Sequence, residues 1–174
     1  MAVKTITLNL NKQLILEAVK TDTYLTGQAE KSVDGANNAR SYNEQAGDDV
    51  YHERKLLRTL YGAVGRFEVE LADFIDSSSG SISNTLSDNN DTFTITFTTS
   101  SRFNEGLITP MSQLAQEYLI NRMIAMWWMA MKPDLANAYT LYYQDSLASI
   151  RKCLTKTAPQ AQSATFDSIQ GTSV

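Results

Sequence analysis

The most reactive side chains of this sequence are its only histidine, His52, and its only cysteine, Cys153. A structural zinc site needs several His or Cys ligands at fixed spacings, and a cysteine nucleophile needs a base and an oxyanion site. The residues around His52 and Cys153 suggest neither arrangement. We therefore expect His52 to be a solvated surface residue and Cys153 to be a half-buried structural thiol.

Four carboxylates lie close together in the middle of the chain: Glu68, Glu70, Asp73 and Asp76. Paired carboxylates can perform acid–base chemistry or bind a cation, but a solvated acidic helix face is the simpler interpretation. The sequence also lacks the glycine-rich signature of a phosphate-binding loop. We predict no catalytic residue, no cofactor and no metal ligand, and hence a protein that is not an enzyme.

Aromatic residues are unusually frequent in the last third of the chain: Tyr118, Trp127, Trp128, Tyr139, Tyr142 and Tyr143. Core packing explains most of them, although aromatic residues are also enriched at the centres of protein–protein interfaces. Adjacent residues on a helix point to different faces, so we expect that Trp127 and Trp128 cannot both face one core. The tryptophan pair therefore predicts a helix with partners on more than one side.

Length and composition limit the class of protein. A chain of 174 residues fits one domain with a sizeable core. A net charge of −4 argues against tight nucleic-acid binding. The single cysteine excludes an internal disulfide, and the first ten residues alternate rather than form a signal peptide. The apolar run Leu119–Met131 is too short to cross a membrane and contains Arg122.

Two regions have the alternating pattern of β-strands. Val3–Leu10 is predicted to be a strand that either joins a later hairpin or crosses to another subunit. That hairpin is predicted at about residues 81–99, with strands Ile82–Leu86 and Thr92–Thr98 around a polar turn. The apolar face of the second strand, which includes Phe93 and Phe97, must cover either the helical core or a neighbouring subunit.

Four helices are expected from apolar residues at steps of three and four. The first spans about residues 11–31, with a thin stripe of Leu14, Ala18, Leu25 and Ala29. The second spans about residues 48–76, with a long stripe of Leu57, Leu60, Val64, Phe67, Leu71 and Phe74. Gly62 and Gly65 lie inside the second helix, which indicates either close packing of another backbone or simple tolerance.

The last two helices are separated by a proline. Thr109 is expected to cap the third helix, with Pro110 at its first position. Pro133 then ends it and opens a fourth helix over about residues 134–156. Residues 1–157 are thus predicted to be a single mainly α domain with a small antiparallel β element. Residues 158–174 are predicted to be a flexible or extended tail.

The segment Leu107–Leu154 combines a proline-started helix, a tryptophan pair, a Lys-Pro-Asp junction and a tyrosine-rich last helix. With the long amphipathic helix and the hairpin before it, this segment resembles the head–tail connector or adaptor proteins of tailed bacteriophages, and gut-phage neck proteins in particular. The chain is longer than compact members of that family because of its N-terminal strand and its C-terminal tail.

The resemblance implies a structural virion protein at the neck, assembled from subunits made in the host cytoplasm. It implies a homo-oligomeric ring, usually twelvefold, that contacts the portal protein and other neck or tail proteins. DNA would pass through the ring without sequence-specific binding, and no membrane would be involved. The candidate residues for the subunit or portal interface are Trp127, Trp128, Tyr142, Tyr143, Phe93 and Phe97.

Two other classes of protein remain as alternatives. A helical protein-binding module of a host would be a stable monomer in solution. An enzyme with an unrecognised site would lose a specific activity when His52 or Glu68 is replaced.

Overall fold

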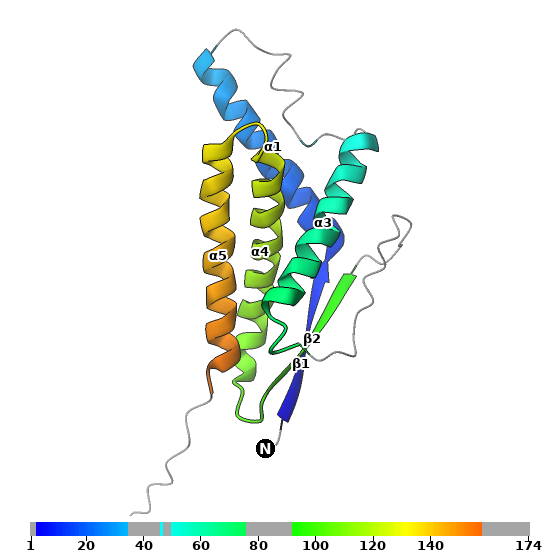
Figure 1. Ribbon diagram of the computed structural model, residues 1–174, viewed down its shortest axis with the longest axis vertical. Coiled ribbons are helices and arrows are strands. Elements are labelled where there is room, and N and C mark those ends of the chain that lie inside the picture. Colours follow the sequence, from blue (N-terminus) through cyan, green and yellow to red (C-terminus); the bar gives the residue numbers. More distant parts are fainter. Residues whose placement is uncertain (1–2, 35–45, 47–49, 76–91, 158–174) are drawn as a thin grey trace, which may run out of the picture.

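The computed structural model describes residues 3–34, 46, 50–75 and 92–157, which form an elongated, mainly helical molecule (Figure 1). Its elements in chain order are β1 (Val3–Asn11), α1 (Lys12–Asp34), α3 (Val50–Glu70), β2 (Thr92–Ser100), the 3-10 turn η1 (Glu105–Leu107), α4 (Ile108–Trp128) and α5 (Pro133–Thr155). The described residues are mainly helical, with one small antiparallel sheet, and the predicted fold class is confirmed.

The two strands pair with each other although they lie far apart in the sequence. β1 runs antiparallel to β2, with Val3 opposite Ser100 and Asn11 opposite Thr92. The N-terminal strand therefore joins the later strand, which was one of its two predicted partners. The other predicted strand of the hairpin, Ile82–Leu86, lies outside the described residues.

One face of this sheet is apolar and buried, and the other is polar. Ile6, Leu8, Leu10, Ile95 and Phe97 are each at most 3% exposed and belong to the hydrophobic core. The alternate positions of β1 are exposed, as the period of two requires. The apolar face of β2 thus covers the core of its own subunit, which was the simpler of the two expectations.

Helix α1 turns a different face to the core from the one predicted. Its buried residues are Ile15, Val19 and Thr23, whereas Leu14 and Leu25 are each 57% exposed. The predicted stripe of Leu14, Ala18, Leu25 and Ala29 is therefore wrong as a core-facing stripe at Leu14 and Leu25, and the Ala29 side chain lies outside the described ones. Both sets of residues have helical spacing, and packing against the rest of the subunit selects one of them.

Helix α3 buries most of the predicted stripe. Leu60, Val64, Phe67 and Leu71 are fully buried, and Leu57 is only partly covered. The helix ends at Glu70, six positions before the predicted end at residue 76, and the chain turns at once. The amide of Phe74 donates to the carbonyl of Leu71, and the amide of Thr98 in β2 donates to the carbonyl of Phe74.

Helix α4 begins one residue earlier than Thr109, and its N-cap is Leu107 without a side-chain hydrogen bond. The predicted Thr109 cap is therefore wrong. The preceding turn is capped instead, because the side chain of Asn104 accepts a hydrogen bond from the amide of Gly106. This turn satisfies backbone groups just before α4 starts.

Helix α4 occupies the centre of the subunit. It contacts α1, α3, α5 and β1, and in Figure 1 it lies between α5 and α3. Its fully buried side chains include Met111, Tyr118, Leu119 and Trp128. After a short turn, Pro133 opens α5 as predicted, and α5 runs back along α4. A helix that is apolar around most of its surface is stable only when it is enclosed in this way.

Trp128→Ala is expected to destabilise the subunit by about 3–5 kcal/mol, because Trp128 is fully buried and its truncation leaves a cavity. Urea unfolding followed by circular dichroism measures the free energy of unfolding. Met129→Ala is the matched control, since Met129 is 64% exposed and its truncation should change stability by less than about 0.5 kcal/mol. Equal losses in the two variants would contradict the observed packing.

Gly62→Ala is expected to raise the free energy of unfolding by up to about 1 kcal/mol, because Ala is the better helix former. Outside the local backbone of α3 and the adjacent residues, no described atom lies within 4 Å of a Cβ added at Gly62 or at Gly65, so the change meets no clash with another described element. The same unfolding measurement tests this prediction, with Gly65→Ala as a second variant. A loss of stability in both variants would show that something packs against these glycines.

Candidate functional site

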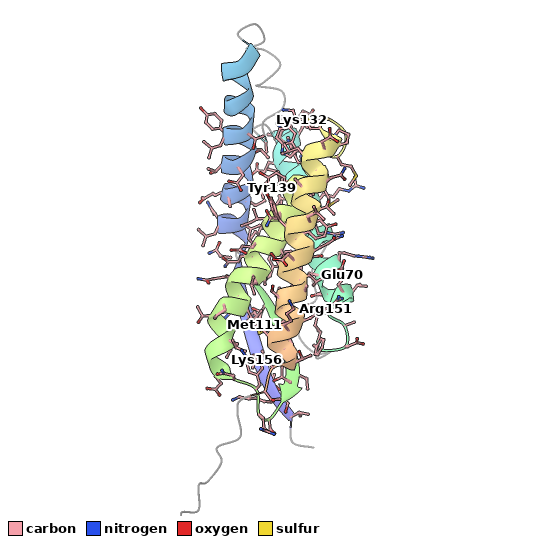
Figure 2. The ribbon with its side chains drawn as sticks, turned by 90° about the vertical axis from the view of Figure 1, so that its left-hand side faces the viewer. Glu70, Met111, Lys132, Tyr139, Arg151 and Lys156 are labelled. Atoms are coloured by element: carbon pink, nitrogen blue, oxygen red, sulfur yellow. The ribbon has the colours of Figure 1, made fainter. Side chains whose placement is uncertain are left out.

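The densest polar cluster of the described residues lies where α3, α4 and α5 meet. Glu70 ends α3, and its carboxylate accepts a hydrogen bond from Nε of Arg66 at 3.0 Å. Nη1 of Arg122 on α4 lies 4.0 Å from the same carboxylate oxygen. Nη2 of Arg151 on α5 donates to the backbone carbonyl of Glu70 at 2.7 Å, and Figure 2 shows these two residues side by side.

Two neighbouring aromatic rings lie beside the Arg122 guanidinium. The centre of its guanidinium lies 5.2 Å from the ring of Tyr143 and 6.0 Å from the ring of Tyr118. The Arg122 Nη1 also lies within 3.4 Å of the Tyr118 hydroxyl. Guanidinium groups are attracted to aromatic faces and to carboxylates, so this arrangement joins three helices through one cation.

The cluster has a structural role, and we call its residues Glu70, Arg122 and Arg151 the clasp. Arg151 satisfies a carbonyl at the C-terminal end of α3, where the helix dipole favours a positive charge. The Glu70 carboxylate lies between two guanidinium groups and accepts a charge-assisted hydrogen bond from Arg66. The carboxylates predicted to form a solvated acidic face thus behave differently: Glu68 and Glu70 are half-buried, and burial raises the pKa of Glu68. Asp73 is exposed, and Asp76 lies outside the described residues.

His52 is half-buried rather than solvated, which corrects the expectation from the sequence. Its ring meets that of Trp127 edge-on, with the ring centres 5.4 Å apart. Lys55, one turn further along α3, places its Nζ 4.3 Å from the centre of the Trp127 ring. His52 and Lys55 therefore fix the first half of α3 against the last turns of α4. Cys153 is half-buried and packs on the core, as predicted.

The two tryptophans both face the interior of one subunit. Trp127 is 4% exposed and Trp128 is fully buried, and both belong to the same hydrophobic core. The inference that they cannot face one core is wrong, because α4 is covered on several sides by elements of its own chain. The partners on more than one side, which the tryptophan pair predicted, are present within the subunit.

The other four candidate interface residues differ in exposure. Phe97 is fully buried, whereas Phe93 and Tyr143 are half-buried and pack on the core. Tyr142 is 59% exposed, and its ring meets that of Tyr139 edge-on. Of the six, Tyr142 is thus the side chain that a partner can reach most directly, and its contact with a partner stays a prediction.

An open hollow of about 280 Å³ lies between the first halves of α1 and α3. Leu16 and Leu57 contribute apolar surface to it, and lysine and glutamate side chains contribute charges of both signs. This lining favours no particular charge on a ligand. Within the described residues, no group of three His, Cys, Asp or Glu side chains could hold a metal ion. No helix among them is both long and apolar enough to cross a membrane.

Comparison of the chain with family models, with curated proteins and with solved structures finds no match.

Replacing Tyr118 by Phe is expected to change how stability depends on pH. Burial raises the pKa of Tyr118 to about 12, against a partly compensating effect of the Arg122 cation. The unfolded chain therefore loses this phenol proton first. The contribution of Tyr118 to stability is complete below pH 10 and is lost as the pH rises from 10 towards 12.

Urea unfolding of the wild type and of Tyr118→Phe between pH 8 and pH 11 measures this effect. The difference in unfolding free energy between the two proteins should be constant up to about pH 10 and should then change in favour of the variant. Tyr142→Phe is the control, because the Tyr142 ring is mostly exposed. A pH-independent difference for Tyr118→Phe would contradict the assigned pKa.

Proposed function

We propose that this chain is a structural virion protein that forms a subunit of a head–tail connector ring. The ring would join the portal to the tail and line the DNA channel. The observation that carries the proposal is the number of large apolar side chains left exposed on every described helix. They include Leu14, Leu25, Tyr51, Val69, Leu141 and Tyr142, which are 57–76% exposed, and Met126 on α4, which is 43% exposed.

Apolar side chains that lie together on a surface mark a contact site, because contact with a partner removes them from water, whereas singly exposed ones are normal. Leu14 and Leu25 share one side of α1, and Leu141 adjoins Tyr142 on α5. The described fold agrees with such a role, since its most reactive side chains are used in packing. Glu70 and Arg122 join helices, and His52 lies against Trp127. A fold alone does not define a function, so these features support the proposal together with the resemblance of Leu107–Leu154 to phage neck proteins.

The charge of the chain is compatible with a channel for DNA. A net charge of −4 repels phosphate groups, which lets a duplex slide rather than bind. Subunits in such a ring make head-to-tail contacts that close by rotation. The same exposed side chains would also suit a helical module that binds a host protein, and the experiment must separate the two.

The test is a cryo-EM reconstruction of tailed particles whose genome encodes this chain. The proposal expects density for the α4–α5 hairpin between the portal and the tail, repeated around the particle axis. A reconstruction that places the chain in the capsid shell or in a tail fibre would contradict the proposal. Particles that lack the chain, combined with a stable monomer in solution, would favour the host binding module.

A further inference from the structure

Helix α1 carries an outward surface that combines apolar and acidic residues. We call it the acidic–apolar face of α1, and it consists of Leu14, Glu17, Ala18, Thr21 and Leu25. These positions follow steps of three and four, so they share one side of the helix. Leu14 and Leu25 are 57% exposed. Glu17, the one carboxylate of this face, is exposed at the rim of the hollow beside α3 and accepts a hydrogen bond from the Gln13 amide. The core-facing residues Ile15 and Val19 lie on a different side.

Helix α3 carries an outward surface of opposite charge. We call it the basic face of α3, and it consists of Arg54, Arg58, Gly62, Arg66 and Val69. Val69 is 66% exposed and the Arg66 side chain is 57% exposed. Gly62 lies at the centre with no described atom within 4 Å of an added Cβ. The surface is therefore positively charged, apolar at one end, and open in the middle.

We propose that the acidic–apolar face of α1 in one subunit packs against the basic face of α3 in the next copy of this chain. This contact rests on the proposed function, because it supplies the head-to-tail interface that a ring requires. Ala18 and Gly62 are small residues near the centres of the two faces, so the helices can approach each other closely. Leucines and Val69 then lose exposed apolar area, and Glu17 meets the arginines.

The positions of the two faces favour this occupant. Both faces point away from the core, and Figure 2 shows α1 along one edge of the molecule and the Glu70 end of α3 towards the other. A contact between two such faces uses different surfaces on each copy, so it is heterologous and repeats from subunit to subunit. Burial raises the pKa of the Asp22 carboxyl, which borders the acidic–apolar face. A nearby cation from the next subunit would compensate such a poorly solvated carboxylate.

A duplex of DNA is the other class of partner that a basic helix face can bind. DNA would cover the basic face of α3 but would leave the leucines of α1 exposed and its carboxylates close to phosphate. A second copy covers both faces with one contact. The net charge of −4 also favours the protein partner, because the arginines are then used between subunits.

Chemical cross-linking of the purified full-length chain tests the contact. Thr21→Cys and Gly62→Cys are introduced together in a Cys153→Ser background, and the concentrated protein is treated with a bis-maleimide. A heterologous contact produces a ladder of dimers, trimers and larger species on a denaturing gel. The proposal is overturned by a chain that stays uncrosslinked, or by a product that stops at the dimer.

Matched variants control for chance collisions and for loss of folding. Gly62→Cys with Lys156→Cys should give no ladder, because Lys156 is exposed beyond the end of α5. Each single-cysteine variant should give none either. Circular dichroism melts of every variant should match those of the Cys153→Ser parent, since the side chains replaced in addition are exposed and the change at Gly62 meets open space.

Charge reversal tests the chemistry of the contact. Arg54→Glu with Arg58→Glu should lower the cross-linking yield by roughly tenfold or more, because like charges then face each other across the interface. In the cysteine background, Glu17→Lys should lower the yield in the same direction, and combining it with the two α3 reversals should restore the ladder. Reversals that leave the yield unchanged would overturn the proposed pairing. A different result would assign the basic face to nucleic acid. In that case the wild type would retain DNA, the Arg54→Glu with Arg58→Glu variant would not, and no ladder would form.

Cross-linking and particle imaging have separable outcomes. A ladder from a chain that is absent from the neck of particles would support the contact and contradict the connector function. A chain imaged at the neck without any ladder would support the connector function and contradict this contact.

Discussion

The enclosure of α4 is the constraint on which the rest of the subunit depends. This helix is apolar around most of its circumference, so it requires cover from several directions at once. The chain supplies that cover with α1, α3, α5 and β1, and each of them turns one apolar face inward. The clasp of Glu70, Arg122 and Arg151 adds directional contacts at the junction of three helices, where apolar packing alone would permit sliding. The remaining faces of the outer helices are exposed.

Much of the fold could be predicted from the sequence because its local signals are unambiguous. Pro133 breaks the last helical region at the observed position, and the period of two in β1 and β2 identifies their buried faces. Helix α1 shows where such reasoning fails. It carries two apolar stripes, through Leu14 and through Ile15, and a helical period cannot say which one meets the core. Tertiary packing decides between them: the stripe through Ile15 is buried, and the stripe through Leu14 stays exposed on the outer side of α1.

The candidate site was less accessible to sequence reasoning. Arg151 and Glu70 belong to different helices, and no local pattern indicates that a guanidinium will reach a backbone carbonyl so far along the chain. The prediction that Trp127 and Trp128 cannot face one core was wrong for a related reason. Adjacent residues do face different directions, but a central helix has neighbours of its own chain in both directions, so both rings are buried within one subunit. The arginines of α3 were visible in the sequence, but only the fold shows that they lie together on an uncovered face.

The pairing of β1 with β2 has a consequence for how the protein is made. β1 leaves the ribosome long before β2, because Val3 cannot pair with Ser100 until Ser100 has been synthesised. Closing so long a loop costs conformational entropy and delays the sheet relative to the local helices. During that interval the edge of β1 that pairs with β2 is unpaired. Chaperones that cover this edge would therefore limit strand exchange between unfinished copies.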